Sequence, residues 1–339
     1  MPEMRQDAVT GHWVIIATER AKRPEIPKVE KKSDNSPRHN KECFFCWGNE
    51  NTTPPEVYSI RLDGSDPDTT GWLLRVVENK FAAVNLLQPF NIEQVSPLYS
   101  HSYAAGKAEV IIETHHHSKA QSQQSLIELK RVLKSYVDRY QALLEEPELK
   151  YILIFRNCGA IAGASLEHPH SQIIAIPIVP PDVAVEIEAS EMYYKKNKSC
   201  IYCDILDEEL NDKSRIIYEN DHFVSLAPYA SRTPFETMII PKFHSARFET
   251  IDSRQLNSLS SMFKAVFYKL DAGLANPPYN YFIHTSPTQQ NVDQHYHWHI
   301  EIIPKLTVAA GFELGTGMFI NITIPEECAE FLRNIEVEF

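Results

Sequence analysis

The sequence lacks any stretch that would anchor the protein in a membrane or export it. Within its 339 residues, no apolar run approaches the roughly 18 residues that a membrane-spanning helix needs. The N-terminal segment MPEMRQDAVTGHW contains no apolar signal region. We therefore expect a cytoplasmic protein that does not act at a membrane.

Positive charge is also in short supply. The chain has 33 Lys and Arg against 45 Asp and Glu, which gives a formal net charge of −12. This balance excludes a broad surface for nucleic acid or anionic lipid, although a local basic pocket is still compatible with it. With 43% hydrophobic residues the chain can bury a sizeable core. At about 100–200 residues per domain, its length predicts two domains.

Cysteine is scarce too. The chain has six cysteines, which are too few for a disulfide scaffold. Four of the six form two Cys-x-x-Cys pairs, Cys43 with Cys46 and Cys200 with Cys203. Disulfides are rare in the cytoplasm, so the pairs favour metal or redox chemistry. A thioredoxin-like redox role is the weaker interpretation, because each pair has a matching set of histidines downstream.

The same order of motifs occurs twice along the chain. The two series are CFFC (43–46), EVIIETHHHSKA (109–120) and HPHSQIIAI (168–176), then CIYC (200–203), TMIIPKFHSARF (237–248) and HWHIEIIPK (297–305). A duplication of this kind predicts two related domains. We place their boundary at Pro180-Pro181, which gives domains of residues 1–179 and 180–339.

Secondary-structure patterns follow the repeat. A helix is predicted from Ser125, where Glu128 completes a capping box, and another from Asp252 with Gln255 in the same position. Residues 11–18, 109–113, 151–157, 172–179, 279–284 and 295–304 are predicted strands, and 325–336 a closing helix. The charged, proline-rich segment 24–40 predicts a mobile loop.

The first Cys-x-x-Cys pair predicts a zinc site. Two cysteines three positions apart can hold one Zn²⁺ from a tight turn, and two distant histidines complete a closed tetrahedral set with a structural role. The predicted ligands are Cys43, Cys46, His117 and His168. His115 and His116 are adjacent rivals, but only His117 is followed by Ser in the context that recurs at His244.

The second pair predicts a second zinc site by the same logic. Its ligands are Cys200, Cys203, His244 and His297. An alternative is an iron-type nitrogen and oxygen site made of Glu186, His284, His297 and His299. Both sets use His297, so we expect only one of them to form, and the thiols favour zinc.

The segment HPHSQ, residues 168–172, is typical of phosphoryl chemistry. An imidazole can attack phosphorus and form a covalent intermediate, which divides one difficult transfer into two easier ones. Gln172 can donate a hydrogen bond to a phosphate oxygen without adding charge. The preceding segment GAIAGAS (159–165) has small residues whose backbone N–H groups can approach phosphates.

Together these motifs resemble the galactose-1-phosphate uridylyltransferase family of the histidine-triad superfamily. The resemblance extends through residues 10–24, 78–85, 155–165 and 311–321 and covers most of the chain. Plant-type ADP-glucose phosphorylases, which belong to the same family, share the second Cys-x-x-Cys pair and a very similar GFE-GTG segment. The resemblance implies an α+β protein with two tandem histidine-triad-like domains, each an antiparallel sheet flanked by helices.

The resemblance also implies roles for individual residues. His170 would be the nucleophile that becomes nucleotidylated, His168 a zinc ligand, and Gln172 a contact of the transferred phosphoryl group. The implied substrate-binding residues are Asn157, Gly163 and Ser165 at the nucleotide phosphates, Arg20 and Arg23 as a basic pair nearby, Asn79 near the base and ribose, and Glu313 at the hexose. In the family the segment that carries Glu313 reaches the neighbouring subunit of a homodimer.

The implied activity is that of a UDP-glucose–hexose-1-phosphate uridylyltransferase that works by a ping-pong route. The alternative is adenylyl transfer from ADP-glucose to phosphate. Lys80, which stands where uridylyltransferases usually have Asp, and the GFELGTG segment favour it. A zinc-stabilised scaffold without catalysis is a third hypothesis, which the intact HPHSQ disfavours. In the second half Glu301 replaces Gln172 and the Gly-rich approach is missing, so we interpret that half as structural.

Overall fold

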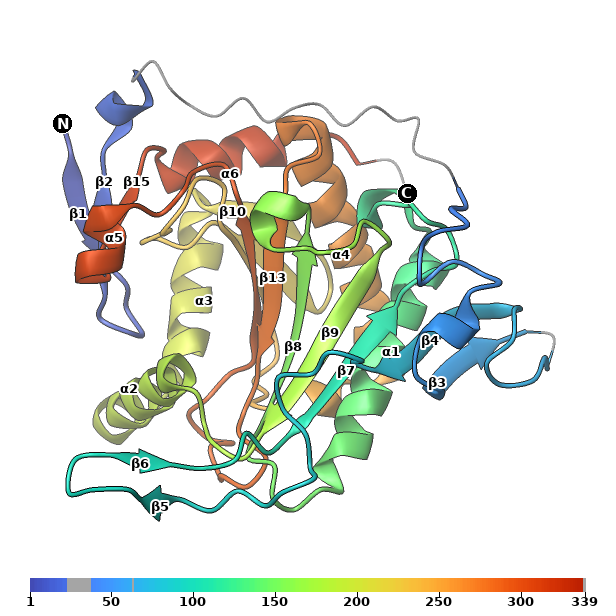
Figure 1. Cartoon of the computed structure of the whole chain (residues 1–339). Coiled ribbons are helices and arrows are strands. Elements are labelled where there is room, and N and C mark those ends of the chain that lie inside the picture. The colour runs from blue at the N-terminus through green and yellow to red at the C-terminus, as the bar shows by residue number, and fades with distance from the viewer. Residues whose placement is uncertain (23–37, 63, 338–339) are drawn as a thin grey trace.

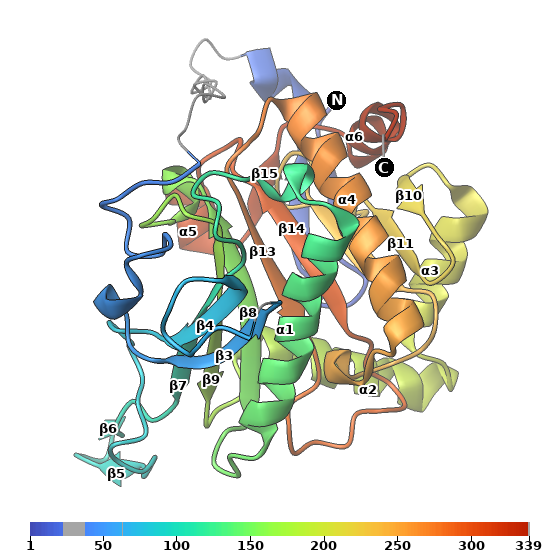
Figure 2. The same cartoon turned by 90° about the vertical axis from the view of Figure 1, so that its right-hand side faces the viewer.

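A computed structural model describes residues 1–22, 38–62 and 64–337 of the chain. Within these residues, ten strands form one fully antiparallel sheet, and the two longest helices lie across one of its faces (Figures 1 and 2). The α+β class predicted from the sequence is confirmed. In the same described residues no helix is long and apolar enough to cross a membrane. The predicted loop at 24–40 lies outside the described residues, apart from its last three positions.

Five neighbouring strands of the sheet come from the first half of the chain. In spatial order they are β8 (Tyr151–Cys158), β9 (His170–Ile176), β7 (Lys107–Ile112), β4 (Trp72–Glu78) and β3 (Glu56–Arg61). The second half repeats this order with β13 (Tyr279–His284), β14 (His299–Pro304), β12 (Thr237–Pro241), β11 (Phe223–Leu226) and β10 (Ile216–Glu219). The repeat of sequence motifs is therefore also a repeat of topology.

The two halves join edge to edge in the middle of the sheet. β8 pairs with β13, and Phe155 lies opposite Phe282. Each half thus covers the edge strand that the other would expose. Equivalent residues are 127 positions apart in this region, as His117 and His244 are. Phe155 and Phe282 are such a pair, so a pseudo-two-fold axis passes between them and places equivalent side chains on the same face of the sheet.

Two long helices cover one face of the ten-stranded sheet and build the main core with it (Figure 2). α1 (Leu126–Leu144) begins at the N-cap Ser125, and α4 (Ser253–Leu274) begins at Asp252; both carry the predicted capping box. Their apolar stripes lie against alternate residues of the strands. On β9, Ile173 and Ala175 are fully buried against the helices, whereas His170 and Gln172 lie on the opposite, open face.

Two helices were not predicted from the sequence. α2 (Pro181–Asn197) begins at Pro181, because proline is well tolerated in the first turn of a helix. α3 (Ile201–Asp212) begins directly after Cys200. The closing helix α6 (Pro325–Arg333) was predicted and is confirmed, three residues shorter.

Both ends of the chain lie against the second half. β1 (Glu3–Gln6), β2 (Trp13–Ile16) and β15 (Phe319–Asn321) form a three-stranded sheet with the short helix α5 (Gly311–Thr316) beside it (Figure 1). A hairpin of β5 (Glu93–Gln94) and β6 (Ser100–His101) projects from the first half. Residues at the very start of the sequence therefore help to build the surroundings of the C-terminal strands.

Candidate functional site

The loop before β3 brings the first thiol pair to two histidines near β7 and β9. Cys46 Sγ lies 3.5 Å from His117 Nδ1, and Cys43 Sγ and Cys46 Sγ each lie 3.6 Å from His168 Nδ1. All four side chains are buried. A Zn²⁺ ion with ordinary bond lengths would hold S and N ligands about 3.5 Å apart at tetrahedral angles. The four residues therefore fit a closed tetrahedral metal site.

The orientation of His168 suits a ligand. Its Nε2–H donates to the carbonyl oxygen of Thr114 at 2.7 Å, which leaves Nδ1 with its lone pair facing the thiols. Burial lowers the pKa of His168 to about 3, so the ring is neutral at physiological pH. The rival His115 stacks on Trp47 with ring centroids 4.2 Å apart and is outside the group.

The second thiol pair repeats this arrangement at the start of α3. Cys203 Sγ lies 3.4 Å from His244 Nδ1 and 3.6 Å from His297 Nδ1. The other ring nitrogens are again bonded to backbone carbonyls, that of His244 to Asp293 at 2.7 Å and that of His297 to Pro241 at 3.1 Å. Cys200 completes a second group that could hold a metal ion.

In the part of the chain that the structure describes, a third group could also hold a metal. It consists of Glu186, His284, His299 and Glu301, whose ligand atoms lie within 4.8 Å of one another. The expectation that an iron-type set and the thiol set exclude each other is wrong. His297 lies with the thiols, and Glu301 takes its place beside the other three residues, so each group has its own four side chains.

His170 stands at the first position of β9, on the open face of the sheet. Its Nδ1–H donates to the carbonyl oxygen of His168 at 2.7 Å, so Nε2 carries the lone pair. Burial lowers the pKa of His170, which keeps the ring neutral and nucleophilic. Phe45, from between the two thiols, meets the ring edge-on at 5.5 Å between centroids. Phe45 therefore links the first Cys and His group to His170.

The Gly-rich segment forms a tight turn between β8 and β9. Gly159 and Gly163 both have positive φ, 86° and 85°. A Cβ at Gly159 would come within 2.9 Å of Pro278, so the turn requires glycine there. At Gly163 an added Cβ would meet Asn157 Nδ2 at 3.8 Å, which places that amide nitrogen beside the loop. The backbone N–H groups of the turn and the Asn157 amide thus lie close enough together to bind one phosphate group.

The structure also reveals a residue that the sequence analysis missed. Asn280, on β13 of the second half, donates to Asn157 Oδ1 at 2.7 Å and to the carbonyl oxygen of Ala162 at 2.8 Å. It lies opposite Asn157 in the register of β8 and β13. No sequence motif marked this residue, because the pairing of β8 with β13 was not predicted.

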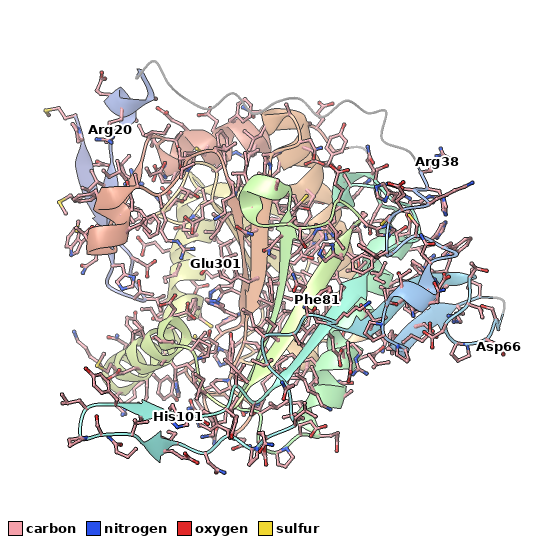
Figure 3. All side chains as sticks on the ribbon, in the orientation of Figure 1. Arg20, Arg38, Asp66, Phe81, His101 and Glu301 are labelled. Carbon is pink, nitrogen blue, oxygen red and sulfur yellow. The ribbon has the colours of Figure 1, made fainter. Side chains whose placement is uncertain are left out.

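The remaining predicted substrate residues are spread more widely. Asn79 follows β4, and its Oδ1 accepts from the backbone of the exposed Phe81 (Figure 3). Ser165 is exposed at the end of the Gly-rich turn. Arg20 lies beyond β2 near the three-stranded sheet (Figure 3), and Glu313 lies in α5 beside β15. Arg23 is outside the described residues.

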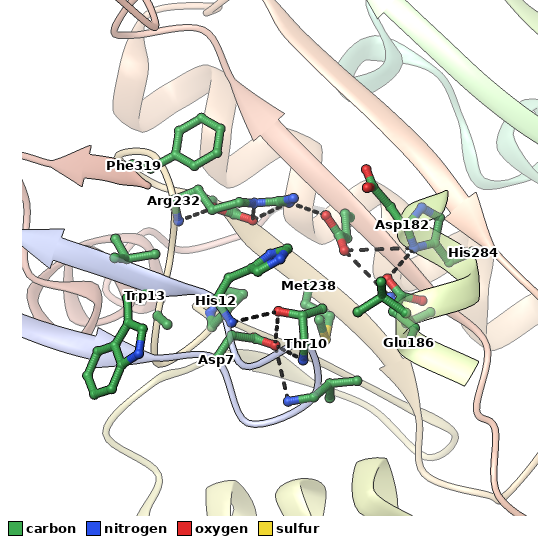
Figure 4. Close-up of a pocket in the computed structure, with 18 of the residues that line it drawn as sticks. Asp7, Thr10, His12, Trp13, Asp182, Glu186, Arg232, Met238, His284 and Phe319 are labelled. Atoms are coloured by element: carbon green, nitrogen blue, oxygen red, sulfur yellow. Dashed lines mark hydrogen bonds and ion pairs between the residues drawn. The ribbon is translucent and has the colours of Figure 1, made fainter. Parts of the chain in front are cut away.

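The cavity in Figure 4 lies over the second half of the sheet and not at His170. Its volume is about 380 Å³, and it is bounded by the N-terminal residues 7–14, helix α2 and strands β12 to β14. Arg232 bonds Glu236 and Glu301 there, and His284 donates to Glu186 at 2.8 Å. The cavity is thus lined by carboxylates and imidazoles.

This acidic cavity occupies the place that the pseudo-two-fold axis assigns to the site around His170. His299 and Glu301 are 129 positions after His170 and Gln172, the same interval that separates His168 from His297. His284 is 127 positions after Asn157. The second half has therefore kept the histidine on the open face and replaced both neutral amides beside it.

Comparison with known proteins agrees with both halves of this architecture. The profile described as galactose-1-phosphate uridyl transferase, N-terminal domain, matches residues 1–180, and that of the C-terminal domain matches residues 186–337. An ADP-glucose phosphorylase of Arabidopsis thaliana is 36% identical, over 99% of this chain and 93% of that protein. A galactose-1-phosphate uridylyltransferase of Thermotoga maritima is 30% identical over all of both chains. The crystal structure of an Arabidopsis ADP-glucose phosphorylase with bound ADP-glucose superposes with a TM-score of 0.84 and 35% identity, over 99% of this chain and all of that one.

Proposed function

The chain belongs to the galactose-1-phosphate uridyl transferase family and is a nucleotidyltransferase, and from this premise we propose that it transfers a nucleoside monophosphate through His170. We assign it the activity of a UDP-glucose–hexose-1-phosphate uridylyltransferase of galactose metabolism. The observation that carries the proposal is that His170, whose Nε2 is left free by the bond from Nδ1 to the His168 carbonyl, shares the open face of β9 with the neutral amide of Gln172.

In the first step His170 Nε2 attacks the α-phosphorus of UDP-glucose. A P–N bond forms, the bond from that phosphorus to the bridging oxygen breaks, and glucose 1-phosphate leaves with the electron pair. In the second step a phosphate oxygen of galactose 1-phosphate attacks the same phosphorus and displaces His170, which gives UDP-galactose. The leaving group in the first step is a phosphate ester, so little general-acid help is needed.

The surrounding residues act by position and by hydrogen bonding. Gln172 lies two residues from His170 on the same face and can donate to a non-bridging oxygen. Asn157 and the backbone of the turn at Gly163 and Ser165 can hold the phosphates from the other side. These groups are neutral and fixed before substrate arrives, which favours in-line displacement.

A second candidate function is phosphorolysis of ADP-glucose by the same covalent route. It is favoured by the 36% identity with the Arabidopsis phosphorylase and by Lys80, the exposed residue after Asn79. Lys80 Nζ donates to the carbonyl of Thr52 at 3.3 Å, which holds it beside the loop that carries the first thiol pair. Its ammonium group can only donate hydrogen bonds, so it would select acceptors on the base or ribose.

The two functions are separated by labelling the protein. Incubation with UDP-glucose or ADP-glucose, each labelled in the α-phosphate, is expected to transfer label to His170 only from the true donor, with the UDP-glucose arm positive. Peptide mapping under alkaline conditions, where phospho-imidazole bonds survive, locates the label. Label from ADP-glucose alone would establish the second candidate, and absence of label from both donors would refute covalent catalysis.

For the metals we propose Zn²⁺ in both Cys and His groups, a view supported by ligand spacings of 3.4–3.6 Å and by the second hydrogen bonds of His168, His244 and His297. When bound there, the ion ties loop to strand and keeps the thiolates in place. For the third group, nitrogen and oxygen donors favour an ion such as iron.

We also propose a homodimer that works in the cytoplasm. The dimer is supported by the position of Arg20 and Glu313 beside the three-stranded sheet over the second half, because the roles implied for them then lie in the site of another copy (Figure 3). The cytoplasm is supported by four cysteines in groups that need reduced thiols. Residues 1–179 and 180–339 remain our proposed domains, with one sheet shared between them.

A further inference from the structure

We propose that Asn280 is a positioning residue: from the second half of the chain it turns the amide of Asn157 so that its NH₂ group faces the phosphoryl group held at His170. This inference rests on the proposed function, since it concerns the same site. It assigns a task in the reaction to the second half of the chain, in which His284 and Glu301 stand at the positions equivalent to Asn157 and Gln172.

The direction of the Asn157 amide follows from its partner. An amide side chain has one oxygen that accepts and one nitrogen that donates. Asn280 Nδ2 donates to Asn157 Oδ1 at 2.7 Å, so the oxygen of Asn157 is directed toward β13. Its nitrogen then lies on the other side, near the Gly-rich turn, 3.8 Å from the point where a Cβ of Gly163 would be.

Asn280 also holds the turn itself. Its second N–H donates to the carbonyl oxygen of Ala162 at 2.8 Å, the residue just before Gly163. The two N–H donors of the Asn280 side chain therefore bind the two parts of the proposed phosphate site, one the Asn157 amide and the other the Gly-rich turn. This double contact fixes the distance between the Asn157 amide and the backbone donors of the turn.

The sheet does not need an amide at this position. The pseudo-two-fold axis relates Asn280 to Leu153, 127 positions earlier, and β8 pairs normally with Leu at that place. The backbone of Asn280 pairs with β8 and β14 whatever its side chain is. The amide of Asn280 is thus an addition on one side of the axis only, and it points toward the half that contains His170.

If Asn280 is absent, the Asn157 amide can rotate by half a turn and present its oxygen to the substrate. A carbonyl oxygen facing an anionic phosphate oxygen repels it, whereas the N–H donates to it. Asn280→Asp makes the wrong orientation the favoured one, because a carboxylate only accepts and draws the Asn157 NH₂ toward itself. Asn280→Leu, which copies position 153, leaves the amide free to rotate.

The test measures the single-turnover rate at which the donor nucleotide labels His170. We expect Asn280→Asp to lower this rate roughly 30- to 100-fold and Asn280→Leu roughly 3- to 10-fold. Asn220→Asp is a matched control, because Asn220 is a half-buried amide of the second half whose Nδ2 donates to the Ser258 carbonyl at 2.7 Å, far along the sheet in the hairpin of β10 and β11. It is expected to label at the wild-type rate.

A double-mutant cycle separates positioning from a merely structural role. In an Asn157→Ala background, Asn280→Asp is expected to add less than about a two- to threefold further loss, because the amide that it orients is gone and only its contact with the Ala162 carbonyl is left to lose. Losses that multiply, or an Asn280→Asp protein that labels at the wild-type rate, would overturn the inference.

The experiment also distinguishes this inference from the proposed function. If the wild-type protein forms no nucleotidyl-histidine, the covalent mechanism fails. The inference is then judged by the dissociation constants for UDP and ADP, which Asn280→Asp should raise about tenfold in the wild-type background and less than about two- to threefold in Asn157→Ala. Unchanged affinity in the wild-type background would refute it independently of the chemistry.

Discussion

The two halves of the sheet hold the same histidine in the same way and surround it differently. His170 and His299 each stand at the first position of a strand, and each uses Nδ1 to bind the carbonyl of the residue two positions earlier, at 2.7 and 3.2 Å. The orientation of the imidazole is therefore a property of the His-x-His backbone. It does not by itself make a nucleophile.

What differs is the charge that the open face presents. Around His170 stand the neutral amides of Gln172 and Asn157 and a turn rich in N–H groups. Around His299 stand Glu301 and Glu186, under a cover formed by the N-terminal sheet (Figure 4). Burial opposes ionisation of Glu301, but the neighbouring Arg232 and the hydrogen bond with His299 outweigh it and hold the pKa of the carboxyl below its ordinary value. An ionised carboxylate only accepts hydrogen bonds, so Glu301 offers a phosphate group no donor, unlike the amide of Gln172.

The largest contrast between the halves is expected when each open-face histidine is removed. His170→Gly should lower turnover more than about 10⁴-fold, because no other group in the site can take the nucleotide. His299→Gly should keep turnover within about threefold, since its imidazole faces carboxylates. Steady-state rates of both variants provide the test, with circular dichroism to confirm that each is folded.

A His170→Gly protein with full activity would contradict the mechanism. Loss of activity in a folded His299→Gly protein would contradict the comparison, because the second cavity would then take part in catalysis.

The next largest effect on activity is expected when Gln172 and Glu301, which lie two positions after the two histidines, are each replaced by the residue found in the other half. Gln172→Glu places in the first half the carboxylate that the second half has, and should lower kcat/KM roughly 10²- to 10³-fold by removing a donor and adding a negative charge. Glu301→Gln leaves Arg232 paired with Glu236 alone and should lower stability by about 1–3 kcal/mol without affecting kcat/KM.

Activity assays and thermal unfolding of the two variants check this pair of expectations. Equal losses of kcat/KM in both would mean that the amide at 172 has no special part in phosphate binding.

Much of the contrast between the two halves could be predicted from the sequence, because it depends on local motifs. The Cys-x-x-Cys pairs, HPHSQ and the capping boxes at Ser125 and Asp252 involve residues close together in the chain, and their spacing alone suggests the chemistry. The structure gathers each of the two predicted sets of Cys and His ligands into one group. Whether those groups hold zinc, and which residues touch substrate, remain predictions.

The parts that could not be predicted depend on contacts between distant segments. The pairing of β8 with β13 decides that Asn280 meets Asn157, and no periodicity along the chain specifies which strand edges meet. In the third group the sequence predicts Glu186, His284 and His299 but not Glu301, because only the fold shows that His297 lies with the thiols while Glu301 lies beside the other three. The placement of Arg20 beside the second half likewise follows from the pairing of β2 with β15.

The two Cys and His groups allow the finest comparison, because their geometry is nearly the same while their neighbours differ. Cys43→Ser and Cys203→Ser should each remove about one equivalent of metal per chain, measured by mass spectrometry of the purified protein, and should lower Tm by roughly 5–10 °C. Of the two, only the first contacts the proposed nucleophile. Phe45, between its two thiols, contacts the His170 ring, and His168 supplies the carbonyl that orients it. Turnover should therefore fall several-fold further in Cys43→Ser than in Cys203→Ser at a temperature where both are folded. Equal turnover in the two variants would mean that the first group only stabilises the fold, as the second is expected to do, and that its closeness to His170 has no catalytic consequence.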